Sequence, residues 1–344
     1  MQLSSFSWPR RVVVSVLACA MVAACSVHEG ATATTSPLQV GTPSPGMLSL
    51  LVEPEQGVAP IDALLASARY SIDLTMYELV DPQVEHTLES AATRGVAVRV
   101  ILDTNREKSA NLPAYNELRA HGVHVVWADK RYAATHEKAV VIDGTVAAVM
   151  SLNLTSRYYT DTRDFAVLDR QAADVQAIEQ VFDADYRHAK TATPAGNDLV
   201  WSPGAQDVLL TLIGSATRTL LVENEEMALP TVTTALERAA QRGVQVSVVM
   251  TRQDDWATAF DKLSRARVDV RTYSPSASLY IHAKAIVVDA GTTRQKAFIG
   301  SQNFSAASLD HNRELGLLTA DPQLVDALAT TIKADAASAS RWKG

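Results

Sequence analysis

Two short stretches of this chain carry a histidine and a lysine two residues apart, with an aspartate five residues beyond the lysine. The residues are His136, Lys138 and Asp143 in the first stretch, and His282, Lys284 and Asp289 in the second. An imidazole can transfer a proton or attack an electrophilic atom, and an ammonium group can bind an anion. The neighbouring residues are apolar and often β-branched, as in a buried strand. Because burying such polar groups is costly, their occurrence twice indicates a functional site rather than packing.

The alternation of side chains along a strand separates the aspartates from the other two groups. Histidine and lysine, two residues apart, point to the same face of a strand. The aspartate lies seven residues after the histidine and therefore points to the opposite face. We expect Asp143 and Asp289 to support the backbone rather than to contact a substrate.

The two stretches belong to a repeat that covers most of the 344 residues. Patterns typical of helices and strands alternate from about residue 47, and the triplet Arg-Gly-Val at 94–96 recurs at 242–244. His136 and His282 are 146 residues apart, close to the spacing of the triplets. Strands alternating with helices predict an α/β fold, here two tandem pseudo-symmetric α-β-α sandwich repeats. A near-symmetric interface between the repeats would bring the two His-Lys strands together.

We expect the first repeat to span residues 47–190 and the second to span 199–340, with a linker at 191–198 that contains proline and glycine. In the first repeat the expected helices are 61–69, 82–94, 114–121 and one after residue 168 that runs through 189. The expected strands are 71–77, 96–102, 123–127, 135–143, 146–150 and 164–168. In the second repeat the expected helices are 208–216, 231–241, one that includes 263–266 and one at the C-terminus after residue 318. The expected strands are 219–222, 244–249, 268–271, 280–289, 297–300 and 314–318.

The first 24 residues are predicted to be a lipoprotein signal peptide. Arg10 and Arg11 precede an apolar run at 12–22 that is too short to span a bilayer as a mature helix. The small residues before Cys25 resemble a bacterial lipobox, in which the cysteine is lipidated; an ordinary signal peptide cleaved nearby is the alternative. Residues 25–46 would form a flexible tether. We therefore expect an extracytoplasmic protein anchored through Cys25 to the outer face of the cytoplasmic membrane or to an outer membrane.

The composition fits a globular protein and gives little support to a nucleic-acid partner. Hydrophobic residues make up 47% and charged residues 20%, which allows a sizeable core. The net charge is −7, whereas domains that bind nucleic acids are usually basic. A locally basic cleft is still compatible with this acidic net charge.

Each His-Lys stretch is followed by a Ser-x-Asn turn and by an acid eleven residues after the asparagine. The residues are Ser151, Asn153 and Asp164 in the first repeat, and Gly300, Ser301, Asn303 and Glu314 in the second. With these motifs the chain resembles the phospholipase D superfamily over roughly residues 47–340. Met150 stands where the family has a glycine, which puts the first turn in doubt, and Asp164 is shorter than the usual glutamate.

The resemblance implies a metal-independent, two-step reaction on a phosphodiester, with no cofactor. His136 would attack phosphorus and form a phosphohistidine, while His282 would protonate the leaving oxygen and later activate water; the pseudo-symmetry leaves the reverse order open. Asp164 and Glu314 would orient the imidazoles. Whether each acid acts within its own half or across the two halves is left open. The residues expected to bind the phosphate are Lys138, Lys284, Asn153, Asn303, Ser151 and Ser301.

The remaining histidines give no comparable signal. His188 and Lys190 fit His-x-Lys, but no aspartate follows at the required spacing, and we expect them at the surface. His86, His121 and His124 lack recognisable ligand spacing, so we expect surface residues and no metal site.

The aromatic residues are less informative. Trp127, Trp201 and Trp256 are expected to pack in the core or at a cleft rim rather than to stack on bases. Tyr158 and Tyr159 follow the first Ser-x-Asn turn and fit the mouth of a cleft as well as they fit packing.

Three functions follow from these observations. The first is a lipid-anchored phospholipase D-like enzyme that hydrolyses or transfers headgroup phosphodiesters of phospholipids. The second is an extracytoplasmic nuclease, which the compact repeats of about 145 residues favour and the acidic charge opposes. The third is a non-enzymatic lipoprotein with a relic site, which the two complete motifs oppose. Expected partners are a phospholipid or other phosphodiester and the membrane, and the chain is expected to be a monomer with an internal pseudo-dimer.

Overall fold

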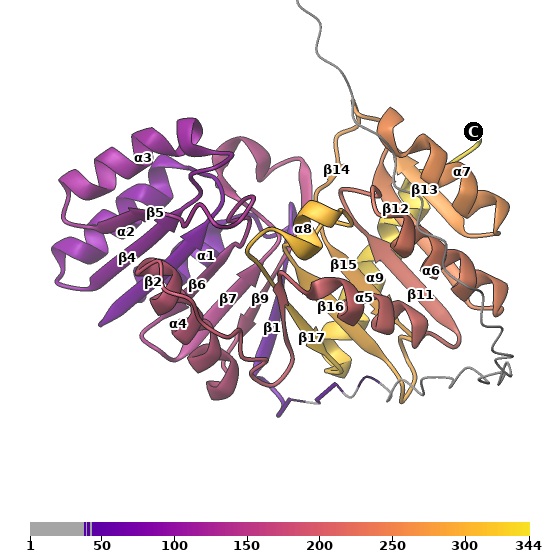
Figure 1. The fold of residues 1–344 in the computed structure, drawn as a ribbon, viewed down its shortest axis with the longest axis horizontal. Coiled ribbons are helices and arrows are strands. Elements are labelled where there is room, and N and C mark those ends of the chain that lie inside the picture. The colour runs from indigo at the N-terminus through magenta and orange to yellow at the C-terminus, as the bar shows by residue number, and fades with distance from the viewer. Residues whose placement is uncertain (1–37, 39, 42) are drawn as a thin grey trace, which may run out of the picture. The chain divides into compact units, whose positions relative to one another are not determined.

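The computed structural model describes residues 38, 40, 41 and 43–344 (Figure 1). The predicted signal peptide, Cys25 and most of the predicted tether lie outside these residues. Among the residues that are described, no helix has the length and apolar character needed to cross a membrane.

Each half of the described chain is built on one mixed sheet, and the two sheets share the same strand order. The first sheet runs β1-β9-β7-β6-β2-β4-β5, and the second runs β10-β17-β16-β15-β11-β12-β13, with β18 added at the edge. The first sheet contains β1 (Leu48–Glu53), β2 (Ser71–Met76), β4 (Ala97–Leu102), β5 (His124–Trp127), β6 (Ala139–Ile142), β7 (Val146–Met150) and β9 (Thr162–Asp169). The second contains β10 (Leu199–Ser202), β11 (Thr219–Glu223), β12 (Gln245–Thr251), β13 (Asp269–Tyr273), β15 (Ala285–Val288), β16 (Lys296–Gly300), β17 (Glu314–Thr319) and β18 (Ser340–Arg341).

Helices cover both faces of each sheet, and β6, β7 and β15 inside the sheets are apolar along their whole length. In the first half these are α1 (Ala59–Ala66), α2 (Pro82–Thr93), α3 (Lys108–Ala120) and α4 (Ala172–Tyr186). In the second half they are α5 (Ala205–Gly214), α6 (Pro230–Gln241), α7 (Ala257–Arg265) and α9 (Pro322–Ser338), with the short α8 (Ala306–Asp310). The predicted α/β fold of two tandem sandwich repeats is confirmed.

Local sequence signals set where these helices begin. Asp81 accepts hydrogen bonds from the backbone N–H groups of Gln83 and Val84, and Pro82 occupies the first turn of α2. The predicted start of α3 at residue 114 was late, because the helix begins at Lys108 and contains Pro113.

Each half has its own apolar cluster, and a further cluster is shared by the two halves. Residues of α4 such as Ile178 and Val181 belong to the same buried cluster as Leu328 and Ile332 of α9. Strands of both sheets contribute to this cluster, so the halves are joined by packing as well as by residues 191–198, which form no helix or strand.

The two predicted His-Lys strands are not continuous. The first is regular only from Ala139 onward, and the second divides into β14 (Tyr280–Ile281) and β15. The reason is that each segment leaves its own sheet and pairs with the other half: β14 runs parallel to Thr162–Arg163 of β9, and Thr135 bridges to Arg313. This cross-pairing carries each histidine to the other half.

Candidate active site

His136 is held by an acid from the second half. Its Nδ1 lies 2.8 Å from Oε2 of Glu314, the first residue of β17. The other carboxylate oxygen of Glu314 accepts hydrogen bonds from Ser308 Oγ (2.6 Å) and Asn312 Nδ2 (3.0 Å). Because an ionised carboxylate only accepts, Nδ1 of His136 carries the proton and Nε2 is left with its lone pair.

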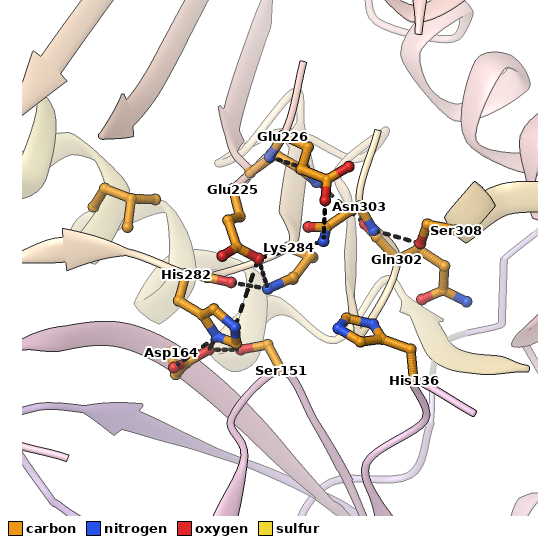
Figure 2. A network of polar contacts seen from close by, with 12 residues as sticks. His136, Ser151, Asp164, Glu225, Glu226, His282, Lys284, Gln302, Asn303 and Ser308 are labelled. Carbon is orange, nitrogen blue, oxygen red and sulfur yellow. Dashed lines mark hydrogen bonds and ion pairs between the residues drawn. The ribbon is translucent and has the colours of Figure 1, made fainter. Parts of the chain in front are cut away.

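His282 is held by an acid from the first half in the same way. Its Nδ1 lies 2.8 Å from Oδ1 of Asp164, and Ser151 Oγ donates to that oxygen at 2.5 Å (Figure 2). The short aspartate side chain reaches its histidine because β14 pairs directly with β9. Each half therefore supplies the orienting acid for the histidine of the other.

The surroundings shift the pKa values of residues in the two histidine–acid pairs. Burial lowers the pKa of His136, and the attraction of Glu314 offsets only part of that effect. Burial alone would raise the pKa of Asp164 and Glu314, but the facing imidazoles, the buried lysines and the serine hydrogen bonds together outweigh it and lower both pKa values. A neutral imidazole at position 136 is the form that can act as a nucleophile.

The two lysines are fully buried but have different neighbours. Lys138 Nζ donates to the carbonyl of His136 at 2.7 Å and lies 4.7 Å from the centre of the Tyr77 ring. Lys284 Nζ donates to the carbonyl of His282 and to Oε2 of Glu225, the latter at 3.0 Å. Burial lowers the pKa of Lys138 to about 7.

The asparagines and serines of the two turns take different positions. Asn153 and Asn303 line the cavity, and Oδ1 of each is buried without a partner among the described residues. Ser151 and Ser301, which we expected to bind phosphate, instead contact Asp164 and the carbonyl of Leu315. Both serines are fully buried and, like the two lysines, are not among the residues that line the cavity, so their role in phosphate binding stays a prediction.

The motif aspartates bind backbone and do not line the cavity. Asp143 accepts from the N–H groups of Arg69, Tyr70 and Ser71. Asp289 accepts in the same way from the backbone of residues 217–219. Each aspartate has a positive φ, 53° and 51° respectively, where the chain turns at the end of the strand.

A cavity of about 570 Å³ joins the two histidines and is lined mainly by acids and tyrosines. The lining residues include Glu53, Tyr77, Glu78, Glu107, Asn153, Arg157, Tyr158, Tyr159, Asp161, Asp164, Glu225, Glu226, Tyr280 and Asn303. Tyr158 and Tyr159 thus form part of its wall, and Tyr159 also donates to Asp81 at 2.8 Å. Trp127, Trp201 and Trp256 are not among the lining residues.

Sequence reasoning missed Glu225 and Tyr77. Each lies just beyond the strand that pairs with its own His-Lys strand, two residues after β11 and one after β2. The repeat spacing of 148 residues maps Tyr77 onto Glu225, so an alignment of the two repeats would have paired these two positions.

His86, His121, His124 and His188 are not among the residues that line the cavity. His86, His124 and His188 are exposed. His121 lies 3.5 Å from carboxylate oxygens of Glu89 and Glu117, but the same Nδ1 donates to the Glu117 carbonyl at 3.0 Å. Because this nitrogen is already engaged, we assign no metal there.

Comparison with known proteins places the chain in a family. A family model described as "Cardiolipin synthase, PLD-like domain" matches residues 61–186 and again residues 209–336. The chain belongs to this family. It is thus a member of the phospholipase D superfamily with two repeats, as the motifs predicted, and each matched segment contains one His-Lys pair.

Curated relatives and a solved structure agree with this assignment. The chain is 26% identical over 326 residues to cardiolipin synthase A of Yersinia pseudotuberculosis, covering 80% of this chain and 66% of that protein. It is 26% identical over 308 residues to cardiolipin synthase A of Serratia proteamaculans, covering 74% and 62%. The chain thus spans less than two thirds of these relatives. The phosphatidylserine synthase of Haemophilus influenzae has the same fold, with a TM-score of 0.66 at 13% identity over 86% of this chain and 87% of that one.

Proposed function

We propose that this protein is a metal-independent phosphodiesterase of phospholipase D type that hydrolyses or transfers headgroup phosphodiesters of phospholipids. The observation that carries the proposal is the reciprocal pairing of two histidines with acids from opposite halves, at 2.8 Å in each case. The family to which the chain belongs adds that lipids are the substrate class to test first.

In the first step, Nε2 of His136 attacks phosphorus and the bond from phosphorus to the leaving oxygen breaks. His282, with its Nδ1 proton held by Asp164, gives the Nε2 proton to the leaving alcohol. The product is a phosphohistidine at His136 and a neutral His282.

In the second step, His282 removes a proton from water or from an acceptor alcohol. The resulting oxygen attacks phosphorus and breaks the bond to His136, releasing a phosphomonoester with water or a new diester with an alcohol. His282 keeps the proton that it took from water or the alcohol, so the enzyme ends in its starting state.

The charge that develops on the phosphoryl oxygens requires donors at fixed positions. Lys138 and Lys284 are both fully buried, so their positive charges act where water screens them little. Asn153 and Asn303 add neutral donors on the cavity wall. Together these four groups are the proposed phosphate site.

Anchoring to a membrane is a second part of the proposal. Residue 25 carries the predicted lipid, and the described fold begins at β1, which starts at Leu48. A Cys25→Ala variant should move from the membrane fraction to the soluble fraction of the producing cell. Retention of this variant in the membrane fraction would contradict the anchor while leaving the enzymatic proposal intact.

A side-by-side substrate comparison tests the activity. Vesicles of phosphatidylglycerol or phosphatidylcholine with a primary alcohol should yield a phosphatidyl alcohol or phosphatidic acid, and excess EDTA should not reduce the rate. His136→Ala and His282→Ala should each lower turnover by at least about 10³-fold. Release of nucleotides from DNA or RNA without lipid product would favour the nuclease, and inactivity on both classes would favour the relic site.

A further inference from the structure

Glu225 places a carboxylate oxygen on the phosphate-binding groups of the second half. Its Oε2 lies 3.0 Å from Lys284 Nζ, 3.3 Å from Asn303 Nδ2 and 3.6 Å from Nε2 of His282. Figure 2 shows these side chains converging on one point, with His136 facing them from the opposite side. The proposed reaction needs a phosphoryl oxygen and a leaving oxygen near these same three groups, so Glu225 occupies part of the phosphate position.

Several contacts keep Glu225 in place and ionised. Tyr280 donates its hydroxyl to Oε1 at 3.2 Å, and the side chain is only 22% exposed. Burial alone would raise the pKa of Glu225, but Lys284 and His282 outweigh it and hold the pKa far below its ordinary value. The neighbouring Glu226 contacts Asn303 as well, at 3.2 Å.

The first half carries no matching charge. At the equivalent position Tyr77 packs its ring 4.5 Å from the ring of His136 and 4.7 Å from Nζ of Lys138. Among the described residues, no carboxylate forms a hydrogen bond with Lys138. The two halves thus differ by one negative charge at the proposed phosphate site: Glu225 contacts Lys284 in the second half, and Tyr77 stands at the equivalent position in the first.

That charge decides which phosphate esters the site can hold. The carboxylate of Glu225 offsets part of the positive charge of Lys284 before a substrate binds, and it lies 3.6 Å from Nε2 of His282. A phosphodiester brings one negative charge next to this carboxylate. A phosphomonoester brings close to two above its second pKa of about 6, so the carboxylate repels it more strongly in this buried site.

We propose that Glu225 is a specificity-determining residue that favours monoanionic phosphodiesters over dianionic phosphomonoesters. This rests on the proposed function, because it takes Lys284, Asn303 and His282 as the groups that meet the substrate phosphate. Hydrolysis converts a diester into a monoester, so the same residue speeds release of the phosphomonoester product. Glu225 does not itself take part in bond breaking.

The test compares two ligands that differ mainly in charge, phenyl phosphate and methyl phenyl phosphate, at pH 8. Their affinities for wild type are measured by calorimetry, and their inhibition of bis(p-nitrophenyl) phosphate hydrolysis is measured in parallel. In Glu225→Gln, binding of phenyl phosphate should tighten about tenfold relative to methyl phenyl phosphate. Glu226→Gln is the matched control, since Glu226 shares Asn303 but forms no hydrogen bond or ion pair with Lys284, and its ratio should stay within about twofold of wild type.

An unchanged ratio in Glu225→Gln, or an equal change in Glu226→Gln, would overturn the assignment to Glu225. Glu225→Ala provides a second variant that removes the charge, and thermal unfolding shows which variants are folded. If wild type does not hydrolyse the diester, the proposed function fails, while the calorimetric ratio still tests Glu225 as the source of charge selectivity.

Discussion

The imidazole of His282 and the carboxylate of Asp164 form a 2.8 Å hydrogen bond across the boundary between the two halves. His136 and Glu314 make the reciprocal contact at the same distance. Neither half therefore contains a complete histidine–acid pair of its own. The repeat serves the site by placing each acid beside the histidine of the other half, through the pairing of β14 with β9 and of Thr135 with Arg313.

Asp164→Asn should lower turnover by about 10²- to 10⁴-fold, because an amide can donate to Nδ1 and stabilise the wrong tautomer of His282. The measurement is kcat on bis(p-nitrophenyl) phosphate. The double variant Asp164→Asn/His282→Ala should be no slower than His282→Ala alone, since both changes disable one unit. Asp326→Asn, which removes an exposed charge on α9, is the control. Additive losses in the double variant would show that Asp164 does not act through His282.

Substitution of a motif aspartate should have a different outcome: the protein loses stability but retains its chemistry. Asp289→Ala removes acceptors from three backbone N–H groups and should cost about 2–4 kcal/mol of unfolding free energy. These contacts lower the pKa of Asp289 against the effect of burial. Their stabilising effect is therefore present above the ordinary pKa and lost as the pH falls below it. Denaturant unfolding at pH 3–7 should show a smaller loss on acidification in the variant than in wild type.

The sequence could predict most of the fold because its signals are local. Apolar strands, Pro82 at a helix start and the triplet repeat each lie within a few residues of the element that they mark. The two His-Lys strands were predicted as continuous because their own residues favour a strand. Their interruption depends on residues of the other half that are more than 100 positions away, such as Arg163 beside Ile281.

The same reason explains which site residues were found. His136 and His282 have motif neighbours along the chain, so their types and spacing were enough. Glu225 matters only because Lys284 and Asn303 fold onto it from 59 and 78 residues away. Glu53 lies opposite Asp164 in β1–β9 pairing, a contact that no local pattern contains.

Lys138→Met should stabilise the protein while removing its activity. The ammonium of Lys138 is fully buried, and the attraction of Glu314, Glu225 and Asp164 offsets only part of the cost of burial, so methionine removes an incompletely stabilised charge. At pH 6 the variant should be more stable by roughly 2 kcal/mol, measured by denaturant unfolding. Lys284→Met should instead destabilise, because it leaves the carboxylate of Glu225 without its ammonium partner. Equal effects of the two changes would contradict this difference.

The pH dependence of the Lys138 effect has a defined sign. The folded pKa of about 7 is below the ordinary value of 10.5, so between these values the unfolded chain binds the additional proton. Wild type should therefore gain stability as the pH rises from 7 toward 10, and Lys138→Met should lack that gain. Over the same range the affinity of wild type for phosphodiesters should fall, because the lysine loses its charge. An alkaline rise in stability that persists in Lys138→Met would contradict the assignment.

Glu53→Gln should remove a pH-dependent weakness of the fold. Both carboxylate oxygens of Glu53 are buried without hydrogen-bond partners among the described residues, directly opposite Asp164. Burial, with the added repulsion of Asp164, raises the pKa of Glu53 from 4.5 to about 8. Between these values the folded chain holds a proton that the unfolded chain has lost, so the unfolding free energy of wild type falls as the pH rises.

The glutamine variant lacks this titration, so the two proteins should have similar stability near pH 5. At pH 8 the variant should be more stable by about 1–3 kcal/mol in denaturant unfolding. Ser202 provides the control, because it lies opposite Glu314 at the equivalent place in the second half and its hydroxyl is also buried without a partner. Since a serine does not titrate in this range, Ser202→Ala should shift stability by a constant amount at every pH. If the difference between Glu53→Gln and wild type were also constant, Glu53 would already be ionised in the folded protein at pH 5.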